Sequence, residues 1–92
     1  MTIYAAHTDI SSDSAAKAAP GALVAVLLSA AAGTAATLIL YDNTAASGTV
    51  LCSLTALAGD TVTFTPAMPY VATKGIYANI GGSGANATVV YL

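Results

Sequence analysis

Residues 61–65 read Thr-Val-Thr-Phe-Thr, a run in which hydroxyl-bearing and apolar side chains alternate at every position. Successive side chains of a β-strand point to opposite faces of a sheet. The period of two therefore predicts a strand with Val62 and Phe64 facing a core and the three threonines facing outward. Residues 76–80 (IYANI) repeat the pattern, with three apolar side chains on the inner face. We expect a sheet that has one buried face.

Turn-forming clusters rich in Gly, Asn, Asp or Pro separate the apolar runs along the chain. The runs predict strands near residues 14–19, 22–29, 35–42, 49–55, 61–65, 75–80 and 86–92. Short strands at this spacing are typical of an all-β sandwich or small barrel. We therefore predict one all-β domain over residues 1–92, a small antiparallel β-sandwich or jelly-roll-like barrel of about seven strands. The sandwich itself is expected over residues 14–92, after a short N-terminal arm of residues 1–13.

The composition excludes several classes of function. Charged residues are 7% of the chain and hydrophobic residues 57%, whereas soluble domains usually carry roughly 25% charge. Lys17 and Lys74 are the only basic side chains, too few to neutralise a run of phosphates, so we expect no nucleic-acid partner. A folded monomer of this mass would expose roughly 4,900 Å², and six charged side chains cannot cover that area. Contiguous apolar patches mark partner surfaces, which predicts an obligate homo-oligomer or a subunit of a larger assembly.

Residues 18–41 contain no charge over 24 positions, which is long enough for a transmembrane helix. Pro20-Gly21 at the start and Gly33-Thr34 in the middle interrupt this stretch with turn signals. Its most apolar parts are two short runs separated by small residues, which favours two buried strands over a membrane span. A membrane helix is the alternative, as is a soluble Ala-rich helix around residues 29–36.

Two of the expected strands are apolar on both faces, residues 23–28 and 38–41. A sandwich of two sheets buries only one face of each strand. We expect the second face to meet a neighbouring subunit, and the alternative is that loops or the arm fold over it. The predicted subunit interface consists of Val24, Val26, Leu28, Ile39 and Tyr41.

The sequence offers no constellation for catalysis. Cys52 is the single cysteine, so no internal disulfide forms, and its apolar flanks predict a buried thiol. His7 and Asp9 lie on one strand face, yet a metal site needs three or four ligands. Asp42 and Asn43 are expected to make turn contacts with the backbone, and residues 81–84 to form a hairpin turn. We predict no enzyme activity, no cofactor and no metal.

Three segments together resemble a group of small bacteriophage virion proteins. They are residues 4–10 (YAAHTDI), residues 17–21 (KAAPG) and residues 38–49 (LILYDNTAASGT). In that group a strand that ends in L-Y-D-N continues through a short loop into S-G-T and the next strand. A Gly-rich turn and a closing strand of the T-V-V-Y type follow, as in residues 81–92 here. The resemblance covers nearly the whole chain in order, and the high Ala content and low charge depart from it.

The resemblance implies a β-sandwich that decorates a phage capsid as a cement protein, typically a trimer bound to the major capsid protein at symmetry points of the head. The protein would then belong to the virion and stabilise the shell. The N-terminal arm is short, polar and without a strong strand pattern, so we expect it to grip the shell through Ile3, Tyr4, His7 and Ile10. Alternatives are a head-fibre or tail-associated attachment module and a small membrane-inserted phage protein such as a coat or holin-like subunit.

Overall fold

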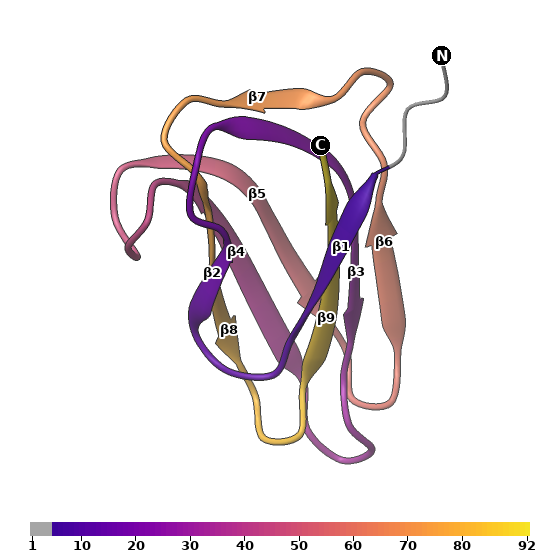
Figure 1. Cartoon of the computed structure of the whole chain (residues 1–92). Helices are drawn as coiled ribbons and strands as arrows, with labels where there is room; N and C mark the ends of the chain where they lie inside the picture. The colour runs from indigo at the N-terminus through magenta and orange to yellow at the C-terminus, as the bar shows by residue number, and fades with distance from the viewer. Residues whose placement is uncertain (1–4) are drawn as a thin grey trace.

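The computed structural model describes residues 5–92, which fold into nine strands without a helix. The strands are β1 (Ala6–Ile10), β2 (Ser14–Lys17), β3 (Gly21–Ser29), β4 (Ala36–Asp42), β5 (Thr49–Ala56), β6 (Thr61–Phe64), β7 (Tyr70–Ala72), β8 (Ile76–Gly81) and β9 (Asn86–Tyr91). They build two antiparallel sheets packed face to face (Figure 1), which confirms the predicted all-β sandwich. The seven strands predicted from sequence match seven of these to within two residues at each end.

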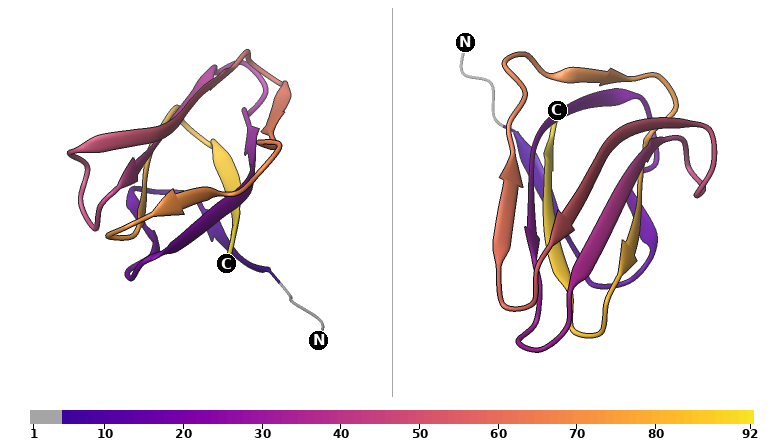
Figure 2. Two further views of the ribbon diagram at one scale, coloured as in Figure 1. Left: turned by 90° about the horizontal axis from the view of Figure 1, so that it is seen from above. Right: turned by 180° about the vertical axis from the view of Figure 1, so that it is seen from behind.

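The two sheets have the strand order of a jelly roll. Sheet A runs β1-β9-β3-β6, with β7 paired to the start of β3, and sheet B runs β2-β8-β4-β5. When β7 is set aside, the first strand pairs with the last, the second with the second last, and so on to the central pair β4 and β5. The chain is thus one long hairpin wound into two layers, the double-sheet arrangement of a jelly roll. Figure 2 shows the two layers from above and from behind.

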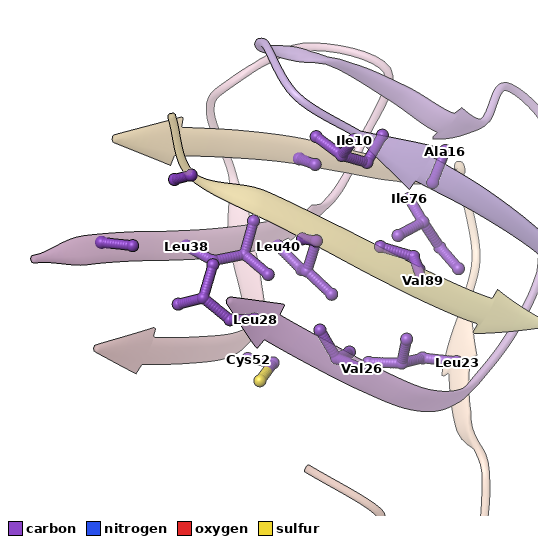
Figure 3. Close-up of a cluster of buried hydrophobic side chains, with 14 of the residues drawn as sticks. Ile10, Ala16, Leu23, Val26, Leu28, Leu38, Leu40, Cys52, Ile76 and Val89 are labelled. Carbon is purple, nitrogen blue, oxygen red and sulfur yellow. The ribbon is translucent and has the colours of Figure 1, made fainter. Parts of the chain in front are cut away.

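The core lies between the sheets and is entirely apolar in the described chain. Its largest fully buried side chains are Ile10, Leu23, Val26, Leu28, Leu38, Leu40, Ile76 and Val89. In Figure 3, Ile10 and Ala16 lie on one side of this cluster and Cys52 on the opposite side. The alternation of β6 is as predicted, because Val62 and Phe64 pack against the core while its threonines are exposed.

The N-terminal arm predicted over residues 1–13 is wrong in its described part. Residues 6–10 form β1, which pairs with β9 from Ala6 opposite Tyr91 to Ile10 opposite Ala87. The sequence AHTDI carries a single large apolar residue at its end, so its side chains alone gave no strand pattern. The backbone of β9 supplies the missing partner, since each edge N–H and C=O gains a hydrogen bond by pairing. The sandwich therefore begins at β1. The three-residue β7 was also missed.

Residues 18–41 form β3, a loop and β4, which confirms the two-strand interpretation and corrects both helical alternatives. In residues 5–92 we find no helix with the length and apolar character needed to cross a membrane. A β-bulge interrupts β3, because Leu23 is opposite Tyr91 but Ala25 is opposite Val90. The extra residue, Val24, shifts the alternation of the residues that follow it by one position.

Residues 81–84 form a turn, but not the predicted hairpin. The turn joins β8 in sheet B to β9 in sheet A, so the two strands do not pair with each other. Gly82 has a φ of 104°, a conformation that L side chains rarely adopt. A Cβ atom there would also collide with the carbonyl oxygen of Ala35. The β8–β9 turn therefore packs closely on the β3–β4 loop. In residues 5–92, the two consecutive strands that pair with each other as a hairpin are β4 and β5.

Candidate interaction surface

The outer face of sheet A carries a shallow apolar groove. Across the sheet, Leu27 of β3 lies between Thr88 of β9 and Thr63 of β6, and Ala25 lies beside Val90. These side chains point away from the core because each occupies an alternate position between buried residues. The groove has a volume of about 300 Å³ and is lined by Ala25, Val26, Leu27, Thr63, Thr65, Thr88 and Val90. Leu27 itself is 39% exposed, so within residues 5–92 nothing covers it fully.

Further apolar residues lie beyond the groove, at the end of the sandwich that β7 crosses (Figure 1). Ala22 exchanges backbone hydrogen bonds with Leu92, at 2.9 and 3.2 Å, and is paired with Val71 on its other side. The three side chains therefore form one row across the sheet. Val71 is 72% exposed and Leu92 43%. We call this surface the apolar face and define it by Ala22, Ala25, Leu27, Val71, Val90 and Leu92.

Charge is confined to one margin of the apolar face. Strands β3, β6, β7 and β9 contain no charged residue. Asp9 of β1 lies beside Thr88, whose hydroxyl donates a hydrogen bond to the Asp9 carboxylate over 3.1 Å. His7 occupies the position opposite Val90 and is exposed. A partner that covers this face would desolvate few ionised groups, which keeps the electrostatic cost of binding small.

Two residues of the predicted subunit interface are not available for contact. Val26 and Leu28 are at most 1% exposed, because they point into the core opposite Val89 and Ala87. The sequence placed Val24, Val26 and Leu28 on one outer face. The bulge at Val24 breaks that alternation, so beyond it Ala25 and Leu27 point outward while Val26 and Leu28 point inward. Val24 itself is half-buried.

The other two predicted interface residues lie on the outer face of sheet B. Ile39 is flanked by Asn79 and Ser53, and Tyr41 is flanked by Tyr77 and Val50. Ile39 and Tyr41 are half-buried by these neighbours. The prediction that β4 is apolar on both faces is therefore confirmed, although polar neighbours break up this outer surface more than that of sheet A.

The predicted capsid contacts divide into three cases. Ile10 is 1% exposed and belongs to the core, so that assignment is corrected. The reason is that β1 joins sheet A and turns Ile10 inward, opposite Ala87. His7 is exposed on the outer face of β1. Ile3 and Tyr4 lie outside the described residues.

Several of the side chains suited to metal binding or catalysis are buried or make structural contacts. Residues 5–92 contain no group of three or more His, Cys, Asp or Glu side chains that could hold a metal ion. Cys52 is buried, as predicted, and burial raises the pKa of its thiol. Asn43 makes the predicted turn contact, since its amide donates to the carbonyl of Ser47 over 2.9 Å.

Asp42 also makes the predicted contact with turn backbone, and the turn is the one between β7 and β8. Its carboxylate accepts hydrogen bonds from the backbone N–H of Lys74 at 2.9 Å and of Thr73 at 3.1 Å. These donors, Lys74 first, hold the pKa of the carboxyl below its ordinary value of 3.8. The contact ties the end of β4 to the β7–β8 turn.

Comparison with known proteins adds no relative: neither a family model, nor a curated protein, nor a solved structure matches the chain.

Proposed function

We propose that the protein is a structural virion protein that assembles into a homo-oligomer, expected to be a trimer, and decorates the outside of a phage head. The apolar face of sheet A is the observation that carries this proposal. It combines exposed Leu27, Val71 and Leu92 with four strands that contain no charge. Exposed apolar surface of this kind favours a partner over water.

The mechanism we propose is mechanical. Subunits pack through the apolar face, which replaces the predicted contacts of Val26 and Leu28 with Ala25 and Leu27. An oligomer that binds the assembled shell but not loose capsid subunits stabilises the shell by mass action. A rigid jelly roll suits this role, because its apolar core and continuous sheets resist deformation of the bound geometry. The shell contact remains a proposal for the N-terminal segment, in which His7 is the predicted contact residue that is described and exposed.

Undecorated phage shells test the proposal directly. Purified protein is mixed with shells, and the temperature or pressure at which they rupture is measured. We expect an upward shift that saturates at a fixed number of copies per shell. An unchanged rupture threshold at saturating protein would overturn the proposal. Recovery of a few copies at the tail, in place of lattice-wide binding, would favour the attachment module.

A matched pair of variants tests the contribution of the apolar face. Leu27→Lys places a charge at the centre of the groove, whereas Ser83→Lys adds the same charge in the exposed β8–β9 turn. We expect L27K to lower the mass measured by light scattering towards that of one chain, because burying an unpaired ammonium group is costly. S83K should leave the mass unchanged. Equal behaviour of the two variants would remove the apolar face from the proposal.

A further inference from the structure

The edge strands of the sandwich differ in how well they are protected. Proteins shield sheet edges with short strands, charges, Pro or bulges, since an open edge invites pairing with another chain. Strands β2 and β6 have four residues each, β2 carries Lys17 and a register shift, and β1 carries Asp9. Strand β5 is eight residues long (TVLCSLTA) and contains no charge, Gly or Pro. Its one protective feature is a bulge opposite Leu40 and Tyr41.

The side of the sandwich between β5 and β6 is apolar along its length. Leu51 and Leu54 of β5, and Val62 and Phe64 of β6, are only partly buried and pack at the margin of the core. At the ends of β5, Val50 is 51% and Leu57 69% exposed. We call this surface the open side and define it by these six residues. In the view from behind, sheet B faces the viewer and β5 is its outer strand (Figure 2).

We propose that β5 pairs antiparallel with β5 of a second copy of this chain, about a twofold axis. Such a pair joins the two B sheets into one sheet of eight strands and satisfies the outward N–H and C=O groups of both edges. The identical edge is the matching partner because it has the same length, brings no charge against an uncharged strand, and sets one apolar margin against another. An isologous contact requires such self-complementarity.

The expected contact area suits a dimer that depends on concentration. An eight-residue edge is about 26 Å long and a two-layer sandwich is on the order of 20 Å thick, so each copy would bury roughly 500 Å². The total of roughly 1,000 Å² lies at the lower limit for a specific interface. We therefore expect the β5 contact to be unoccupied at low concentration and to form as concentration rises, whatever oligomer the apolar face builds. The contact uses neither the shell nor the apolar face, so it stands apart from the proposed function.

Disulfide trapping tests whether β5 of one copy lies beside β5 of a second copy. In a Cys52→Ala background, single cysteines are placed at Val50, Ser53 and Thr55, which are exposed positions of β5, and at Ser11 in the exposed β1–β2 turn, outside both β5 and the apolar face. Cysteines crosslink only when their Cα atoms lie within about 7 Å. Residues near a twofold axis meet their own copies, so crosslinking should peak at one or two β5 positions and be absent at S11C. Equal crosslinking at S11C and at the β5 positions, or monomer at every concentration, would overturn the inference.

A charge variant measures the strength of the same contact. Ser53→Lys with Thr55→Lys places like charges opposite each other across the paired strands, which is destabilising. We expect the dimer dissociation constant to rise by about tenfold or more in sedimentation or light scattering. The control, Ser11→Lys with Ser83→Lys, adds the same charge at two exposed loop positions and should dimerise normally. Shell binding separates the two proposals. If the protein crosslinks through β5 but does not bind shells, only the shell function is overturned; if the β5 variant fails to dimerise but still binds shells, the two contacts are independent.

Discussion

The two sides of this sandwich close in different ways. On the side of β1 and β2, the Thr8 hydroxyl donates to the carbonyl of Ala16 over 3.2 Å and so connects sheet A to sheet B. Because its single proton is used there, Thr8 accepts from the Tyr91 hydroxyl at 2.9 Å. The ammonium of Lys17 lies 5.6 Å from the centre of the Tyr91 ring, within cation–π range. We call this side the closed side.

The closed side also protects its strand edge. Strand β2 is shorter than β8, and the Asp13 carboxylate accepts the backbone N–H of Ile80 at 2.8 Å beyond the end of β2. On the open side, the described residues show no side-chain hydrogen bond between β5 and β6, and partly buried Leu54 and Phe64 occupy the margin. This small chain therefore seals one side with its own polar groups. Its other side has apolar groups and an edge suited to a second chain.

Shortening one large apolar side chain on each side should give the largest difference in unfolding free energy between the closed side and the open side. Ile10→Ala removes a side chain that is 1% exposed on the closed side, and we expect a loss of about 3 kcal/mol of unfolding free energy. Leu54→Ala on the open side should cost about 1–2 kcal/mol, because water already reaches part of that side chain. Urea denaturation of dilute protein measures both values. Equal losses would show that the two sides are packed alike.

The Thr8–Tyr91 contact should account for part of the stability of the closed side. Thr8→Val keeps the shape but removes the hydroxyl, and Tyr91→Phe removes its partner; each should cost about 1 kcal/mol. Because both changes break the same hydrogen bond, the double variant should lose less than the sum of the two. Chemical denaturation of the four proteins gives the coupling. Strict additivity would mean that the two hydroxyls do not interact.

The sequence predicted most of the fold because alternation is strong wherever large apolar residues occur. Residues 61–65 and 76–80 each bury one face, as expected. Strands β1 and β7 could not be found this way, since AHTDI and YVA hold their places by backbone pairing with β9 and β3. Pairing depends on where a partner lies in space, which side-chain pattern alone does not reveal.

The sequence predicted that β3 has an apolar outer face, but not which residues form it. The apolar second face of β3 was visible in the sequence, yet the bulge at Val24 decided which residues occupy it. No residue pattern around Val24 marks that bulge, which is visible only in the register of Leu23 and Ala25 against β9. The outward orientation of Val90 could have been predicted, because Val90 follows Val89, which points into the core. Val71 and Leu92 join the surface only because β7 and the end of the chain pair on both sides of Ala22.

The Asp13 contact gives a smaller test of edge protection. Asp13→Ala leaves the Ile80 N–H to water, and we expect a loss of about 1 kcal/mol or less because the bond is exposed. Asp13→Asn retains an acceptor oxygen and serves as the matched control. Amide hydrogen exchange at Ile80 should accelerate in D13A while exchange along β4 stays unchanged. Unchanged exchange at Ile80 would show that the carboxylate does not protect this edge.

Replacement of Asp42 should have the smallest effect on stability, and that effect should depend on pH. Asp42 lies at the end of β4 and is part of neither the open side nor the closed side. Its folded-state pKa lies below the ordinary 3.8, because the N–H groups of Lys74 and Thr73 favour the charged carboxylate. A group with a depressed pKa contributes stability above its unfolded-state pKa and loses it as pH falls through the folded-state value. We therefore expect the melting temperature to fall below about pH 4, and Asp42→Asn to melt lower at neutral pH but with a flatter acid limb. Parallel acid limbs for wild type and D42N would mean that other carboxylates cause the acid loss. D42N can also be combined with Ile10→Ala or with Leu54→Ala. If each truncation loses the same unfolding free energy with and without D42N, the contact at the end of β4 stabilises the sandwich independently of both sides.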